Sequence, residues 1–192
     1  MRKRLGSATI FGVIAAAFLL ELVRGAPGND VALLSLGALP DSGQIQNEYW
    51  RLISFGFLHY DLRHLLLNSL LLLLLGPIVE RRLGTSLVLL LFLIASVGSG
   101  IGILGKHQVW PAPGVSLGAS GGMFGLLGAA LVLSFRQPFP NRWIRTALLL
   151  VLVLGLAYSF LPGVSMIGHI IGLLLGAAIA LVTRLPRPAP QV

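Results

Sequence analysis

The stretch SLVLLLFLIASVGSGIGIL, residues 86–104, contains no charged side chain. About 20 apolar residues of helix cross the roughly 30 Å hydrocarbon core of a bilayer, so this stretch predicts a membrane-spanning helix. Five further apolar runs of similar length lie at residues 5–23, 62–79, 117–135, 144–160 and 164–182. We therefore expect an all-α, polytopic membrane protein with six transmembrane helices.

The composition excludes other classes of protein. Of the 192 residues, 56% are hydrophobic and 10% are charged, against about 45–50% and about 25% in soluble domains. This excludes a soluble globular protein and a disordered chain, and the absence of cysteine excludes a disulfide scaffold. A net charge of +8 would suggest nucleic acid in a soluble protein, but here the basic residues flank apolar runs. The expected surroundings are a lipid bilayer, with no nucleic-acid partner.

The distribution of Lys and Arg predicts the orientation of the chain. When the six runs alternate in direction, ten basic residues fall on one side and four on the other. The positive-inside rule then places both termini in the cytoplasm, and the 24–58 and 105–116 loops on the outer side. We expect residues 1–184 to form a single six-helix domain and residues 185–192 to form a Pro-rich tail. A signal peptide at residues 5–23 is the alternative for the first run.

Two loops and the end of one apolar run allow further predictions. Residues 24–58 are expected to be a long outer loop whose apolar pieces lie in the interface or re-enter the membrane. This loop and the 144–160 run are candidates for moving parts that admit a substrate. His107 is interpreted as a solvated loop residue, and Glu80-Arg81-Arg82 as an anchor at a membrane end.

Four polar residues stand out within the apolar runs: His64, Asn68, Ser120 and His169. Polar groups inside spanning segments are expensive, so each is a functional hypothesis. His64 and Asn68 are spaced i, i+4, so they share one helix face and can donate hydrogen bonds to one point. The alternative for either residue alone is a hydrogen bond between helices, worth about 1 kcal/mol or less.

Small residues predict which two runs touch. Ser120 lies within Gly118-Ala119-Ser120-Gly121-Gly122, and the 117–135 run carries further glycines. Gly172, Gly176 and Ala180 lie near the His169 face of the 164–182 run. Small residues at every fourth position let helices pack closely. We expect these two runs to meet backbone to backbone and to bring Ser120 within hydrogen-bond distance of His169.

A serine beside a histidine is the minimal activated nucleophile. The histidine takes the hydroxyl proton and later gives it to the leaving amine. The tetrahedral oxyanion needs hydrogen-bond donors, for which the candidates are His64, Asn68 and the backbone N–H of Ser120. The runs contain no acidic residue near their middle, so we expect a Ser-His dyad.

Three alternatives fit the residues less well. Gly118-x-Ser120-x-Gly122 matches the nucleophile elbow of α/β-hydrolases, but that motif needs a preceding buried strand and alternating strands and helices. A zinc protease lacks a His-Glu-x-x-His pattern and cysteine ligands. An aspartyl intramembrane protease lacks two aspartates within the membrane.

Taken together, these motifs resemble the rhomboid family of intramembrane serine proteases. Glu48-Tyr49-Trp50-Arg51 resembles the family's first-loop motif, and His59-x₄-His64-x₃-Asn68 resembles the start of its second helix. Gly118-Ala119-Ser120-Gly121 resembles its Gly-x-Ser-Gly motif, and His169-x₂-Gly172-x₃-Gly176 its sixth-helix motif. All four occur in the family's order on a chain with six apolar runs.

The resemblance implies that Ser120 is the nucleophile, that His169 is the general base, and that His64, Asn68 and the Ser120 amide form the oxyanion hole. It implies a six-helix rhomboid-like bundle in a bacterial cytoplasmic membrane, of the form without an appended soluble domain or seventh helix. The active site would open to the outer side and cleave transmembrane protein substrates without a cofactor or metal. The implied supporting residues are Gly118, Gly121, Phe124, His59, Trp50, Arg51, Gly172 and Gly176.

Phe124 departs from a common pattern, because the aromatic residue that packs on the histidine in this family is often tyrosine. The ring packing is expected to remain, without the hydroxyl. Two other classes of function stay open. A non-catalytic rhomboid-like binder of transmembrane clients would use the same groove, whereas a small-solute transporter would be expected to carry buried charges or an internal repeat. The sequence carries no signal for the oligomeric state.

Overall fold

The computed structural model describes residues 5–137, 141 and 143–185, and over these residues it contains eight α-helices. Two strands of two residues each pair antiparallel, Leu39 opposite Ser116 and Pro40 opposite Val115. In chain order the elements are α1 (Leu5–Val23), α2 (Asp30–Leu36), β1 (Leu39–Pro40), α3 (Arg51–Ser54), the 3-10 turn η1 (Phe55–Phe57), α4 (Leu62–Leu83), α5 (Thr85–Val109), β2 (Val115–Ser116), α6 (Ser120–Arg136), α7 (Trp143–Tyr158) and α8 (Met166–Val182).

Six of these helices correspond to the six apolar runs. Helices α1, α4 and α5 are long and apolar enough to cross a membrane, and α6, α7 and α8 are apolar but shorter. Helix α4 continues to Leu83, past the last residue of its apolar run, and α5 extends to Val109. Helix α6 begins at Ser120 instead of residue 117, because Gly118 takes a left-handed backbone conformation. The expected tail at 185–192 lies outside the described residues from residue 186 onward.

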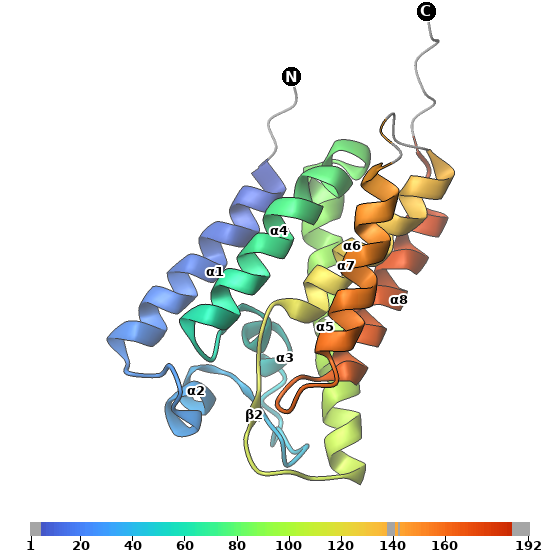
Figure 1. Cartoon of the computed structure of the whole chain (residues 1–192). Coiled ribbons are helices and arrows are strands. Elements are labelled where there is room, and N and C mark those ends of the chain that lie inside the picture. The colour runs from blue at the N-terminus through green and yellow to red at the C-terminus, as the bar shows by residue number, and fades with distance from the viewer. Residues whose placement is uncertain (1–4, 138–140, 142, 186–192) are drawn as a thin grey trace, which may run out of the picture.

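Helix α6 forms the centre of the bundle. It contacts α4, α5, α7 and α8, and α1 lies on the far side against α4 and α5 (Figure 1). Every residue from 121 to 130 is buried, because neighbouring helices surround that part of α6. Helix α1 begins and α8 ends at the same end of the bundle, whereas α2, α3 and β2 gather at the opposite end, here called the loop end (Figure 1).

Helices α6 and α8 touch backbone to backbone, as the small-residue pattern predicted. A Cβ atom on Gly172 would collide with the carbonyl oxygen of Gly121, and one on Gly176 would collide with the carbonyl oxygen of Gly125. In the other direction, a Cβ on Gly128 would collide with the carbonyl oxygen of Leu173. The glycines therefore set the separation of the two helices.

The segment between α1 and α4, which we expected to be a long outer loop with apolar pieces, contains the short elements α2, β1, α3 and η1. The Asn29 side chain caps α2 by accepting a hydrogen bond from Ala32 N at 3.2 Å. Arg51 donates to the carbonyl oxygens of Leu34 at 2.5 Å and Ala38 at 3.0 Å, and its Nε lies 2.7 Å from Glu48. One guanidinium thereby joins α3 to the end of α2 and the start of β1.

Glu80, which we interpreted with Arg81 and Arg82 as an anchor at a membrane end, is buried and joins α4 to the starts of α1 and α5. Its side chain accepts hydrogen bonds from Gly6 N at 2.7 Å, from Ser7 N at 3.1 Å and Ser7 Oγ at 2.8 Å, and from Thr85 Oγ1 at 2.7 Å. These bonds satisfy two backbone N–H groups at the start of α1, where no intrahelical acceptor exists.

His107 is likewise buried, contrary to the solvated-loop interpretation. Its Nε2 lies 3.3 Å from Asp41 Oδ1, and the hydroxyl of Ser116 donates to the same carboxylate oxygen at 2.6 Å. Asp41 thereby joins the far end of α5 to β2, the strand that leads into α6.

The contact between α6 and α8 predicts a specific sensitivity to a single methyl group. Gly176→Ala should lower the free energy of unfolding by about 1–3 kcal/mol, because the new Cβ meets rigid backbone that can yield only if the helices separate. Gly12→Ala is the matched control: no described atom of a neighbouring element lies within 4 Å of a Cβ built there. Its expected effect is neutral or slightly stabilising. Thermal unfolding in bicelles measures both variants, and equal midpoints would contradict the packing argument.

Candidate active site

Ser120 is the first residue of α6, and the backbone before it is fixed by Gly118. Gly118 has a φ of +127°, and its N–H donates to Phe55 O at 2.9 Å. A Cβ on Gly118 would lie 2.6 Å from Cε1 of His64. Glycine is required both for the backbone conformation and for the approach of the imidazole, so the entry into α6 and the position of His64 are set together.

His169 lies in the first turn of α8 and is buried, with 4% of its surface exposed. Ser165 caps this helix by accepting a hydrogen bond from Gly168 N at 3.3 Å. His169 Nε2 lies 2.8 Å from Ser120 Oγ. The close packing of α6 on α8 therefore brings together two side chains that are 49 positions apart in the chain, as the small-residue pattern predicted.

Phe124, one turn after Ser120, stacks on the imidazole of His169. The ring centroids are 4.1 Å apart and the rings are nearly parallel, with an interplanar angle of 6°. The end of the Phe124 ring lies against Gly155 of α7, where an added Cβ would come within 2.8 Å of it. The imidazole of His169 thus packs on Phe124 of α6, and Gly155 of α7 packs against Phe124.

Ser159 is a site residue that the sequence analysis missed. It directly follows α7, is buried, and places its Oγ 2.6 Å from Nδ1 of His169. The same Oγ lies 2.8 Å from the carbonyl oxygen of Gly155. Ser159 falls within the 144–160 run as one small polar residue near its end, so no spacing or periodicity signalled it.

His64 and Asn68 line the same cavity as Ser120 and His169. The Asn68 side chain donates to the backbone oxygen of His64 at 3.0 Å, and its Oδ1 has no hydrogen-bond partner among the described residues. Asp61 caps α4 by accepting from His64 N at 2.7 Å, which fixes the turn that carries the imidazole. The Asn68 amide carries two hydrogens, and one of them makes the bond to the His64 oxygen. The second hydrogen remains available for a ligand.

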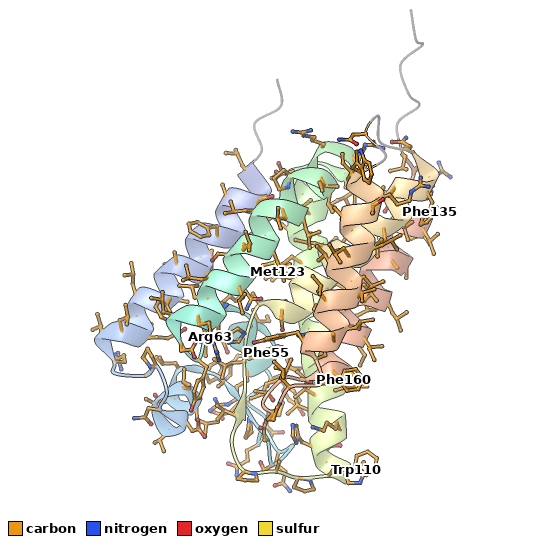
Figure 2. The ribbon with its side chains drawn as sticks, in the orientation of Figure 1. Phe55, Arg63, Trp110, Met123, Phe135 and Phe160 are labelled. Atoms are coloured by element: carbon orange, nitrogen blue, oxygen red, sulfur yellow. The ribbon has the colours of Figure 1, made fainter. Side chains whose placement is uncertain are left out.

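The cavity has a volume of about 740 Å³ and extends from the loop end of the bundle down between α4 and α7. Polar residues around Ser120 line one part, and leucines of α4 together with Val151 and Leu154 of α7 line the other. Figure 2 places Met123, from α6, in the interior of the bundle, whereas Phe135 and Trp110 lie at its opposite ends. The cavity therefore combines an apolar wall with a polar floor beside the serine.

The remaining predicted residues lie outside the cavity wall or support it. Trp50 and Arg51 belong to the α3 region and stack on each other, with the guanidinium carbon 4.8 Å from the indole centroid. His59 is fully buried, and its ring packs edge-on against His64 at 5.0 Å between centroids. Its backbone N–H donates to the buried Glu21 of α1, with the two carboxylate oxygens 3.1 and 3.2 Å away.

Burial lowers the pKa of His59 from 6.5 to about 3, with a smaller contribution from the neighbouring His64. Nδ1 of His59 lies 3.2 Å from the carbonyl oxygen of Phe57. His59 is therefore neutral in the folded protein at pH 7.

This pKa predicts an acid sensitivity of the fold. Below pH 6.5 the unfolded chain binds a proton at His59 that the folded chain excludes until about pH 3, so acid favours unfolding. The contribution of His59 to the free energy of unfolding should fall by about 1.4 kcal/mol per pH unit across this window. His59→Gln should remove that part of the slope, measured by denaturant unfolding at pH 7, 6 and 5. Equal slopes for the two proteins would contradict the assignment.

Comparison with known proteins places this site in a family. A family model described as the Rhomboid domain matches residues 46–186. Rhomboid protease GluP of Bacillus subtilis (strain 168) is 36% identical over 173 residues, covering 88% of this chain and 33% of that protein. The putative rhomboid protease YdcA of the same organism is 35% identical over 134 residues, covering 68% of this chain and 65% of that protein.

A third relative is rhomboid protease GlpG of Yersinia pestis (strain Pestoides F), which is 30% identical over 186 residues, covering 94% of this chain and 64% of that protein. The chain thus spans between a third and just under two thirds of the length of these relatives. The family model covers most of the chain, including the cavity residues from α4, α6 and α8. This protein therefore belongs to the rhomboid family and is an integral membrane protein.

Proposed function

We propose that this protein is an intramembrane serine protease that cleaves peptide bonds in or near the transmembrane segments of substrate proteins. The observation that carries the proposal is the 2.8 Å approach of His169 Nε2 to Ser120 Oγ at the wall of a cavity. An imidazole nitrogen at hydrogen-bond distance from a hydroxyl is the arrangement that activates a serine nucleophile. The relatives named rhomboid proteases support the same reaction class.

In the first half of the reaction, Ser120 Oγ attacks the scissile carbonyl carbon while its proton moves to His169 Nε2. The carbonyl electron pair moves onto oxygen and forms a tetrahedral oxyanion. When the oxyanion collapses, the C–N bond breaks and His169 gives its proton to the leaving amine, which leaves an acyl ester on Ser120. In the second half, His169 deprotonates a water that attacks the ester, and the proton returns to Ser120 as the carboxyl product departs.

The oxyanion is stabilised by His64, by the free amide hydrogen of Asn68 and by the backbone N–H of Ser120. The Ser120 amide begins α6, where backbone N–H groups have no intrahelical acceptor and the helix dipole favours negative charge. His64 and Asn68 reach the same cavity from one face of α4. This chemistry needs no metal or cofactor.

The membrane arrangement belongs to the same proposal. Residues 1–184 form one domain whose six spans are α1 and α4 to α8, and both termini lie in the cytoplasm of a bacterium. Arg81, Arg82, Arg136, Arg145 and Arg184 belong to the ends of helices or loops at the end opposite the loop end, in agreement with the positive-inside rule. The cavity opens at the loop end and therefore faces the outer side. Transmembrane substrates enter beside α7 or beneath the 24–58 segment.

The proposal predicts that cleavage depends on both members of the dyad. Purified protein in bilayers should cut some members of a panel of single-span reporter proteins, and Ser120→Ala and His169→Ala should each abolish cutting while leaving the helical content unchanged. Retained cleavage in folded Ser120→Ala protein would refute the proposal. Wild-type protein that neither cuts reporters nor labels at Ser120 with a fluorophosphonate would instead favour the non-catalytic binder of transmembrane clients.

The oxyanion assignment predicts a defect in turnover. Asn68→Ala should lower kcat by about a hundredfold with little change in KM, because the lost donor acts on charge that develops only in the transition state. Gln44→Ala, in the exposed part of the 24–58 segment, serves as the control and should leave kcat unchanged. A rise in KM alone for Asn68→Ala would assign this side chain to substrate binding instead.

A further inference from the structure

The imidazole of His169 is held on three sides. Ser120 Oγ lies at Nε2, the Phe124 ring covers one face, and Ser159 Oγ lies at Nδ1. The proposed reaction requires Nε2 to arrive without a proton, because it must accept the proton of Ser120. A neutral histidine carries one ring proton, so that proton must then be on Nδ1. No carboxylate contacts His169 among the described residues, so another group must hold this proton on Nδ1.

The two hydrogen bonds of the Ser159 hydroxyl identify that group. Its hydroxyl has one hydrogen to donate and two lone pairs that can accept. The hydroxyl oxygen has two close partners, His169 Nδ1 at 2.6 Å and the carbonyl oxygen of Gly155 at 2.8 Å. A carbonyl oxygen can only accept. Both contacts are therefore hydrogen bonds only if Ser159 donates to Gly155 and accepts from Nδ1–H of His169.

The bond from Ser159 to Gly155 is the ordinary local bond of a serine in a helix, from the hydroxyl to the carbonyl four residues earlier. Thr9 and Thr183 make the same bond to Leu5 and Ile179, each at 2.7 Å. Ser159 differs from them because it is 3% exposed and its lone pairs face an imidazole nitrogen. Water has little access to replace it, so the hydroxyl controls the hydrogen bonding at Nδ1.

We propose that Ser159 is a positioning residue that holds His169 in the tautomer with the proton on Nδ1, leaving Nε2 free to act as the base toward Ser120. The inference rests on the proposed protease function for its catalytic consequence, but the tautomer itself is a property of the resting protein. The expected dyad thereby becomes a line of hydrogen bonds from Ser120 through His169 and Ser159 to the backbone oxygen of Gly155.

This chain of hydrogen bonds orients the imidazole of His169, and only the proton of Ser120 is transferred. When Nε2 takes the proton of Ser120, the imidazolium keeps its proton on Nδ1 and continues to donate it to the Ser159 hydroxyl. An aspartate in this place would neutralise the imidazolium charge, whereas a hydroxyl supplies only a neutral acceptor. We therefore expect Ser159 to be worth about tenfold in kcat, the size expected of one neutral hydrogen bond. The loss of a triad aspartate costs much more.

The tautomer can be read directly by nitrogen-15 NMR of histidine-labelled protein in bicelles, with the His169 signals assigned by their loss in His169→Ala. The measurement is made in Ser120→Ala protein, so that the hydrogen bond from Ser120 cannot itself dictate the result. We expect a protonated Nδ1 and a bare Nε2, and in the Ser120→Ala, Ser159→Ala double variant a large fraction of the opposite tautomer. A protonated Nε2 with Ser159 intact would overturn the proposal.

Kinetics test the consequence with matched variants. Ser159→Ala should lower kcat about tenfold and the rate of fluorophosphonate labelling of Ser120 to a similar extent, with KM unchanged. Ser159→Thr keeps the hydroxyl and should restore most of both rates. Thr183→Val removes a hydroxyl with the same local bond at the other end of α8, and it should leave both rates unchanged. Equal rates for Ser159→Ala and wild type would overturn the positioning role.

The two hypotheses fail in different ways. If the wild-type protein neither cleaves reporters nor labels at Ser120, the protease proposal fails, yet the NMR measurement still reports which nitrogen of His169 carries the proton. If cleavage depends on Ser120 and His169 but Ser159→Ala changes neither the tautomer nor kcat, the protease proposal stands and the role of Ser159 is refuted.

Discussion

The rest of this structure depends on the close approach of α6 and α8. In a bilayer the lipid tails are as apolar as the side chains, so helices associate through packing and hydrogen bonds, with little help from the hydrophobic effect. Glycines at 128, 172 and 176 remove the side chains that would keep the two backbones apart, and those at 121 and 125 let α5 pack closely on α6. The same close approach places Ser120 and His169 on opposite sides of one narrow interface. The packing that stabilises the helix bundle therefore also sets the geometry of this pair.

A second layer of structure fixes the groups that face this interface. Gly118 is held by Phe55 and backed by the ring of His64, and His64 in turn lies beside the buried His59. The ordered segment between α1 and α4 carries two of these residues, and the Arg51 guanidinium holds it together. A segment that looks like a loop in the sequence thus works as a rigid support for one wall of the cavity.

Much of this architecture follows from the sequence for identifiable reasons. Long apolar runs have the length of a membrane span, and small residues spaced by one helical turn indicate which helices touch. The short helices α2 and α3 were missed because four to seven residues carry little periodic signal. The burial of Glu80 and His107 depends on partners distant in the chain, Gly6 and Asp41, that no local pattern indicates. Ser159 was missed for the same reason, because its partner is a ring nitrogen on another helix.

The attachment of α7 has a consequence for the positioning of the base. Within α7, which the structure describes in full, Leu148 is the one buried residue. At one end Arg145 donates to the carbonyl oxygen of Ser134, and at the other Gly155 and Ser159 touch Phe124 and His169. Because so little of α7 is buried, any displacement of this helix from α6 and α8 would also withdraw the Ser159 hydroxyl from the imidazole of His169. The position of this cavity wall and the positioning of the base are therefore coupled through one hydrogen bond.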